Sequence, residues 1–315
     1  MVLTALWIVY IVWGSTYLAI RIAVETLPPF LHASVRFLLA GAIMYAFLWI
    51  KSGRDRVRVT TREVGACAIV GTALLLGGNG LVALGEKTVP SGLAALIIAS
   101  VPLWVILFRA LTGDRVMGGT LIGTFVGFVG VALLVFPGSE GTGATIGGVS
   151  LIVLASFFWA SGSFLSSKLS LPKDPFVSTA VQMLCGAMAL GIVGVASGEI
   201  GDLDPSTFSL SSVMAVAYLV VFGSLAAFTA YTWLLQNAPI SKVATYAYVN
   251  PVVAVFLGWL ILSENITAFI LTGAALIVAS VAFIVRHENS ELREVRERHE
   301  SEAHGVPATA GVESN

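Results

Sequence analysis

The chain has 315 residues, of which 57% are hydrophobic and only 11% are charged, and its mean hydropathy is +0.92. A water-soluble domain carries about 25% charged residues, so this composition excludes an ordinary soluble domain and indicates that lipid surrounds most of the chain. The formal net charge of −1 gives no indication of a nucleic-acid partner. The two cysteines, Cys67 and Cys185, lie in apolar runs, and no cysteine or histidine cluster predicts a metal site or a cofactor.

Apolar runs of about 20 residues, the length that crosses a bilayer, recur along the sequence. Because lipid cannot hydrogen-bond a bare backbone amide, each run must be helical. The predicted spans are residues 3–24, 31–50, 64–85, 91–111, 117–136, 148–168, 176–197, 212–235, 241–262 and 267–285. The first run lacks a basic segment before it and a cleavage site after it, which predicts a span rather than a signal peptide. The sequence therefore predicts an all-α integral membrane protein with ten transmembrane helices.

The distribution of lysine and arginine predicts the orientation of the chain. Residues 51–62 are strongly basic and the segment after residue 285 adds more arginines, whereas the loops on the other side hold Lys87 as their single basic residue. Basic loops face the cytoplasm. We therefore expect a multi-pass protein of the inner membrane with both the N-terminus and the C-terminus in the cytoplasm.

An internal repeat relates the two halves of the chain. A shift of 146 residues places Trp13 on Trp159, and a shift of 149 places Pro102 on Pro251. The matches of tryptophan and proline are the informative ones, because leucine, alanine and valine coincide by chance in any apolar sequence. Five spans per repeat is an odd number, so the two copies must insert in opposite orientations. Inverted repeats are typical of alternating-access carriers that bind their substrate between the halves near the midplane.

These boundaries predict four parts of the chain. The first repeat covers residues 1–136, a linker covers 137–147, and the second repeat covers 148–286. Residues 287–315 are polar and charge-mixed, so they are predicted to form a solvated cytoplasmic tail, with a helix continuing to about Ala303.

Several short motifs recur in an order and spacing found in a known family. They are Trp13-Gly14-Ser15-Thr16, Pro28-Pro29-Phe30, Arg36-Phe37, the mid-span Pro102 and Pro251, and the glycines Gly123, Gly127 and Gly130. In these motifs the chain resembles the EamA-type family of the drug/metabolite transporter superfamily, over about residues 4–285. The resemblance implies ten helices around a central cavity and, usually, export of amino acids or other metabolites. The glutamate that closes the fourth span in that family is Asp114 here, with Glu264 as its second-half counterpart, which is a minor departure.

Charged residues within the spans are candidates for function, because a charge at mid-membrane costs at least about 2.5–3.5 kcal/mol. Arg36 can face a cavity, where it would bind a substrate carboxylate or gate through Glu86. Snorkelling to the nearby surface, or a purely structural ion pair, is the competing interpretation. Arg21 can pair with Glu25, which lies one turn further along the chain.

Uncharged polar and aromatic residues complete the predicted cavity. The polar candidates are Ser15, Asn79, Ser161, Gln182 and Asn250, and the aromatic candidates are Trp13, Trp159, Tyr231 and Tyr248. The amides are the better candidates, because a serine in a helix usually bonds back to its own backbone. Pro102 and Pro251 are expected to kink their helices and free a carbonyl that a ligand can use.

These features favour a secondary transporter, and the family resemblance implies an exporter of amino acids or related small metabolites or drugs. The sequence contains no Walker motif, so a proton gradient or substrate exchange must drive it. Glu86 and Glu264, near the ends of spans, are the acids placed to carry protons.

A channel-like passive facilitator remains an alternative. An intramembrane enzyme is a weaker one, because all four histidines lie outside the span centres. The expected partners are a small-molecule substrate and the lipid bilayer, with a homodimer left open.

Overall fold

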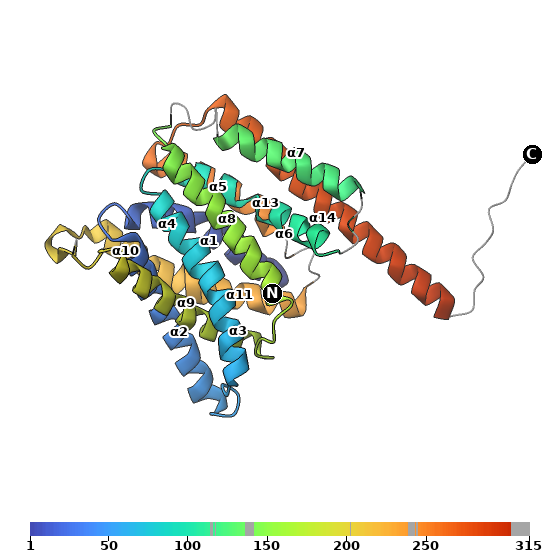
Figure 1. Cartoon of the computed structure of the whole chain (residues 1–315), viewed down its shortest axis with the longest axis horizontal. Helices are drawn as coiled ribbons and strands as arrows, with labels where there is room; N and C mark the ends of the chain where they lie inside the picture. Colours follow the sequence, from blue (N-terminus) through green and yellow to red (C-terminus); the bar gives the residue numbers. More distant parts are fainter. Residues whose placement is uncertain are drawn as a thin grey trace, which may run out of the picture.

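Every element in the computed structural model of the chain is a helix over the part that the structure describes (Figure 1). The structure describes residues 1–113, 116, 118–135, 142–201, 203–238, 243 and 245–303, with the backbone alone at 235–236, 248, 285 and 287–303. Asp114, linker residues 137–141 and the tail beyond Ala303 lie outside the described residues.

The first half of the chain forms five helical spans, two of which are composite. They are α1 (Val2–Ala23), α2 (Pro29–Ser52), the third span of α3 (Thr61–Gly71), the π-helix η1 (Thr72–Gly80) and α4 (Leu81–Gly85), the fourth span of α5 (Ser91–Ile98) and α6 (Val101–Leu111), and α7 (Gly118–Val135). The prolines Pro28 and Pro29 stand at the N-cap and first turn of α2, where their missing N–H groups cost nothing.

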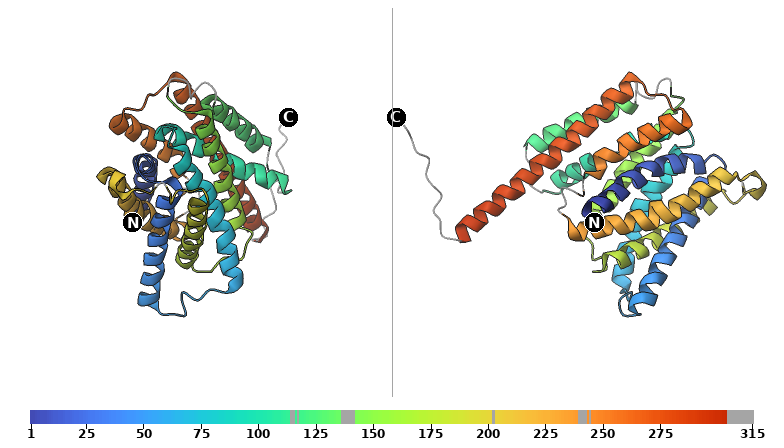
Figure 2. Two further views of the ribbon diagram at one scale, coloured as in Figure 1. Left: turned by 60° about the vertical axis from the view of Figure 1, so that its left-hand side comes forward. Right: turned by 180° about the vertical axis from the view of Figure 1, so that it is seen from behind.

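The second half repeats this order. It contains α8 (Ile146–Ser166), α9 (Pro175–Ala196), the short 3₁₀-helix η2 (Pro205–Thr207), the eighth span of α10 (Leu210–Tyr218), the π-helix η3 (Leu219–Ala226) and α11 (Ala227–Asn237), then α13 (Tyr246–Leu262) and α14 (Ala268–Ala303). Helix α14 extends well beyond the bundle, as the views in Figures 1 and 2 show. Its end at Ala303 agrees with the extension expected from the sequence.

The length and apolar character of these helices fit a membrane protein. In the described chain, eight helical stretches are long and apolar enough to cross a bilayer, and two shorter apolar helices, Val249–Leu262 and Ala268–Ile284, occupy the ninth and tenth positions. The predicted all-α fold with ten transmembrane helices is confirmed. The predicted ninth span begins at residue 241, whereas its apolar helix begins later; residues 239–242 and 244 are outside the described part.

The helices of the two halves pack against each other in a symmetric pattern. Helix α2 packs on its counterpart α9, and α7 packs on its counterpart α14. Helix α1 instead packs on the eighth and ninth spans, whereas its counterpart α8 packs on the third and fourth spans. Each repeat therefore completes its packing against the other.

Small residues make the α7–α14 contact close. A Cβ atom added at Gly130 would lie 3.0 Å from the carbonyl oxygen of Gly273, and one added at Gly127 would lie 2.7 Å from Ser280 Oγ. Ser280 of α14 also donates a hydrogen bond to the carbonyl of Gly123. The spaced glycines recognised in the sequence thus allow two helix backbones to approach, as glycines commonly do in membranes.

Three irregular segments interrupt otherwise regular spans. The π-helices η1 and η3 begin at Thr72 and Leu219 and lie in the third and eighth spans, which are counterparts in the two repeats. The fourth span breaks at Ala99 and Ser100, just before Pro102, whereas α13 continues through Pro251. Such interruptions in membrane helices occur where the backbone lies against protein or lines a cavity.

Candidate functional site

A cavity of about 120 Å³ lies at mid-helix depth and is enclosed by helices of both halves. Its walls come from α1, α2, η1 and α4 to α6 of the first half and from α8, α11 and α13 of the second. The predicted site residues that line it are Trp13, Arg36, Asn79, Pro102, Trp159, Asn250 and Pro251. The structure therefore brings residues of both repeats together around one small space.

Arg36 is the single charged residue among those that line the cavity. It is 4% exposed, and its Nε donates a hydrogen bond to Ser224 Oγ of η3 at 3.0 Å. No carboxylate of the described residues forms an ion pair with it. The snorkelling alternative is not realised, because a snorkelling side chain would be exposed. A buried guanidinium without an acid is costly, so this arrangement favours an anionic group in the cavity.

Two amide side chains face the same space from opposite halves. Asn79 lies in η1 and is half-buried. Asn250 lies in α13 and is buried, and in the amide orientation that satisfies its hydrogen bonding its Nδ2 donates to the carbonyls of Tyr10 at 3.1 Å and Tyr246 at 3.2 Å. Amides offer both a donor and an acceptor, so they can orient a polar ligand beside the arginine.

Aromatic rings form much of the remaining wall. Trp13 Nε1 donates to the carbonyl of Gly223 in η3 at 3.2 Å, and its ring lies 5.0–5.3 Å from those of Phe228, Tyr231 and Tyr246. Its counterpart Trp159 packs against the π-helix of the other half, where a Cβ atom added at Gly78 would lie 2.7 Å from Trp159 Cε3. Each tryptophan thus rests on the π-helix of the opposite repeat.

The break in the fourth span also faces the cavity. Ile98, Ala99, Val101 and Pro102 line the space, and α6 begins anew with Pro102 in its first turn. A discontinuous helix leaves backbone groups without their usual helical partners, and transporters use such groups to bind substrates. Near the predicted kink at Pro102 the α-helix is therefore interrupted at Ala99 and Ser100, whereas Pro251 lines the cavity from within a continuous helix.

The structure places other predicted site residues elsewhere. Ser15 bonds to the Val12 carbonyl and the Tyr218 hydroxyl, and Ser161 bonds back to the Phe157 carbonyl. Gln182, the counterpart of Arg36, donates to Ser178 Oγ one turn back in α9. Tyr231 packs on Trp13 behind the cavity wall. The side chain of Tyr248 lies outside the described residues.

Neither of the two contacts suggested by the sequence, Arg21 with Glu25 and Arg36 with Glu86, is formed in the described part of the chain. Helix α1 ends at Ala23, so Glu25 lies in the following turn, exposed and without the helical spacing that would bring it to Arg21. Arg36 bonds to Ser224 rather than to Glu86. Glu86 is completely buried, and neither of its carboxylate oxygens has a hydrogen-bond partner among the described residues.

Two acidic residues connect the halves at the end of the bundle that holds Glu86. Glu199, after α9, accepts hydrogen bonds from the backbone N–H groups of Phe30 and Leu31 at 2.9–3.1 Å. Glu264, after α13, accepts from the N–H groups of Ser91 and Gly92 and from Ser91 Oγ at 2.7–3.0 Å. Carboxylates are stabilised at helix N-termini, so each one fastens a second-half loop to a first-half helix.

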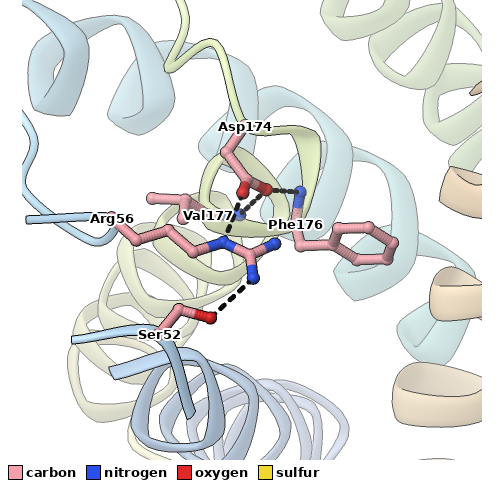
Figure 3. A network of polar contacts seen from close by, with 5 residues as sticks. All are labelled: Ser52, Arg56, Asp174, Phe176 and Val177. Atoms are coloured by element: carbon pink, nitrogen blue, oxygen red, sulfur yellow. Dashed lines mark hydrogen bonds and ion pairs between the residues drawn. The ribbon is translucent and has the colours of Figure 1, made fainter. Parts of the chain in front are cut away.

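A further connection between the halves lies at the opposite end of α2. Arg56 donates to Asp174 at 2.7 Å and to Ser52 at 2.8 Å, while Asp174 also accepts from the N–H groups at the start of α9 (Figure 3). The ion pair is partly exposed, so its contribution to stability is on the order of 1 kcal/mol or less. The halves are thus connected at both ends of the bundle.

The sequence model of the EamA-like transporter family matches this chain twice, over residues 1–136 and 146–286. The chain belongs to the EamA-like transporter family. A relative from Escherichia coli strain K12, "Uncharacterized inner membrane transporter YedA", is 38% identical over 281 residues, covering 89% of each chain. An "Uncharacterized transporter" of Archaeoglobus fulgidus is 28% identical and covers 86% of this chain and 92% of that one. YvbV of Bacillus subtilis, also named as a transporter, is 26% identical and covers 89% and 91%.

A solved crystal structure of a protein 21% identical to this chain has the same fold, with a TM-score of 0.61 over 89% of this chain and 94% of that one. The two matches of the EamA-like family to this chain agree with the two inverted repeats inferred from the sequence. EamA-like proteins are transporters, which confirms that the chain is not an enzyme and removes the intramembrane enzyme from the alternatives.

The sequence did not indicate that Glu199 joins the halves of this EamA-like protein, and it indicated Glu264 as a family motif residue and a proton carrier rather than as a helix cap. Both acids follow the ends of spans and lie on the side that is poor in basic residues. Each acid follows the end of a span, and the helix that it caps begins at a proline or directly after one. This combination is the signal that could have identified both acids as caps of distant helices.

Proposed function

We propose that this protein is a secondary transporter that exports amino acids or related small metabolites by alternating access. The observation that carries the proposal is Arg36, a buried guanidinium at the wall of a central cavity without a carboxylate partner among the described residues. A substrate carboxylate in the cavity would supply the missing charge. Asn79 and Asn250 would orient the polar part of the substrate, and Trp13 and Trp159 would enclose its apolar part.

The size of the cavity favours a small substrate. Its volume of about 120 Å³ is below the roughly 300–1,000 Å³ of sites that hold drug-sized molecules. A small amino acid or organic anion suits this space better than a bulky neutral drug, which would also leave Arg36 without an anion.

The contacts at the two ends of the bundle suggest how access alternates. Opening one end requires separation of the Glu199 and Glu264 caps from α2 and α5, and opening the other requires separation of Arg56 from Asp174. Both sets of contacts are formed in the present structure, so we propose that one set is released at a time while the other holds the halves together. From the basic loops, and from the inner-membrane name of the relative YedA, we further propose an inner-membrane location with both termini in the cytoplasm.

A counterflow assay tests this function. Purified protein in lipid vesicles, loaded in turn with single unlabelled amino acids and their hydroxy-acid and keto-acid analogues, should accelerate uptake of the same labelled compound. A channel-like passive facilitator would show no such acceleration. Absence of counterflow for every compound of these classes would contradict the proposed substrate class.

The variant Arg36→Ala tests the site itself. Loss of a charged hydrogen bond is worth about 1.5–3 kcal/mol, so the counterflow rate at low substrate concentration should fall about tenfold or more. The matched control is Gln182→Ala, at the equivalent position of the second repeat and outside the cavity, which should retain the parent rate. Equal rates in Arg36→Ala and the parent protein would rule out Arg36 as the substrate anchor.

A further inference from the structure

Glu86 is an unusual residue in this fold because it combines complete burial with a lack of partners. It follows α4 at the C-cap position and is 0% exposed. Within the described part of the chain, its two carboxylate oxygens are the only fully buried side-chain oxygen or nitrogen atoms without a hydrogen-bond partner. Buried polar atoms are normally satisfied, so an exception of this kind calls for an explanation.

The surroundings of Glu86 are mainly apolar. Helix α4 packs against α8, whose residues 146–166 include no titratable side chain, and Gly85 next to Glu86 lies against Ile152. From α1, Arg21 and the Tyr17 hydroxyl are close enough to act on Glu86 electrostatically, and so is Glu264 from the loop after α13. Helix α2 contributes His32 and Arg36, and the neighbouring Lys87 is exposed.

None of these groups neutralises the carboxylate in this conformation. Arg21 forms no ion pair with it, and Arg36 is committed to Ser224. Glu264 carries like charge and is itself committed to three donors at the start of α5. An ionised carboxylate buried without a partner costs several kcal/mol, whereas a bound proton removes its charge.

Glu86 is also connected to the walls of the cavity. Its N–H donates to the carbonyl of Val82 at 2.8 Å, and Val82, one helical turn away, lines the cavity. The cap made by Glu264 holds α5, which contributes Ala95 and Ile98 to the same wall. A rearrangement of these walls would therefore change the environment of Glu86.

We propose that Glu86 is the proton-binding site of this transporter, occupied by a proton in the present conformation and vacated when the Glu199 and Glu264 contacts at its end of the bundle are released. In the second state, water reaches the carboxyl group, its O–H bond breaks, and the proton passes to that water while the carboxylate stays on Glu86. Coupling to substrate rests on the proposed transport function, whereas proton binding can be measured without any substrate.

Infrared spectroscopy of the protein in lipid vesicles tests proton binding directly. At neutral pH the parent protein should show the carbonyl band of a protonated carboxyl group, which Glu86→Gln should lack. Glutamine has the shape of a neutral glutamic acid, so this variant should fold, and Glu86→Asp should retain a shifted band. The control Glu25→Gln, an exposed acid at the same end, should retain the parent band. The assignment is overturned by a band that persists in Glu86→Gln, by its equal loss in Glu25→Gln, or by the lack of a band in the parent.

A transport experiment tests the coupling separately. With a substrate found by counterflow, a pH gradient should drive accumulation in vesicles of the parent and of Glu25→Gln, and this dependence should be lost in Glu86→Gln. A sodium gradient alone should drive none. Gradient-driven accumulation in Glu86→Gln equal to that of the parent, or accumulation driven by sodium, overturns the coupling role. Failure of counterflow in the parent contradicts the transport proposal and leaves the infrared result to decide proton binding.

Discussion

Glu199 stabilises a helix that precedes it by more than a hundred residues. Its carboxylate accepts from the free N–H groups of Phe30 and Leu31, and these groups cannot be satisfied within α2 because they belong to its first turn. The residue is 9% exposed, so water replaces the lost bonds poorly when the carboxylate is removed.

We therefore expect Glu199→Ala to lower the free energy of unfolding by about 1–3 kcal/mol, the cost of leaving buried donors unsatisfied. Thermal unfolding of the purified protein in detergent measures this effect. The control Asp55→Ala, at an exposed loop position, should unfold at the temperature of the parent. Equal unfolding temperatures for Glu199→Ala and the parent would show that the cap does not contribute.

For single residues, the sequence predicted the types that line the cavity better than it predicted the directions of their side chains. Arg36, Asn79 and Asn250 were selected because charges and amides are costly in lipid, and they line the cavity. Gln182 is equivalent to Arg36 by repeat, yet its amide bonds to Ser178 within its own helix. The direction of a side chain depends on neighbours that lie far away in the sequence, so the pattern alone could not separate these two positions.

The π-helices are the elements that bring the two tryptophans to the cavity. In η1, Gly77 and Gly78 lie against Phe158 and Trp159, where an added Cβ atom would come within 2.6–2.7 Å of the ring-bearing side chains. Both glycines are therefore required by close approach rather than by backbone conformation.

Gly78→Ala should lower the free energy of unfolding by about 1–3 kcal/mol, because the new methyl group must displace the Trp159 ring from the cavity wall. The matched control is Gly65→Ala in α3 of the same span, where nothing lies within 4 Å of the added atom. That control should be neutral or stabilising by up to about 1 kcal/mol. Tryptophan fluorescence and thermal unfolding report both effects, and equal behaviour of the two variants would contradict the packing described for η1.

The spans themselves were predictable at the element scale, whereas their irregularities were not. Hydropathy locates a membrane helix because lipid requires about 20 apolar residues in one stretch. The break at Ala99 and Ser100 and the two π-helices change only the local hydrogen bonding, and the apolar run continues through them. Pro102 gave a local signal for the fourth span, but η1 and η3 contain no proline and gave none.

The orientation of the whole molecule can be tested with its own cysteines left in place. Cys67 is 0% and Cys185 is 8% exposed, so neither should react with a membrane-impermeant maleimide. Asp55→Cys should be labelled only after the cells are permeabilised, and Ser206→Cys should be labelled in intact cells, because these exposed positions lie on opposite faces in the proposed topology. Labelling of both positions from one side would contradict that topology and with it the inversion of the repeats.

The exchange of partners between α1 and α8 makes each repeat depend on the other for its packing. A polypeptide made of a single five-helix unit would leave unmatched the face of its first helix and the faces of its third and fourth helices. Two such polypeptides inserted in opposite orientations would cover those faces for each other, as the two repeats do here. Holding both units in one polypeptide keeps them in equal numbers and next to each other, so neither unit has to find its partner by diffusion in the membrane.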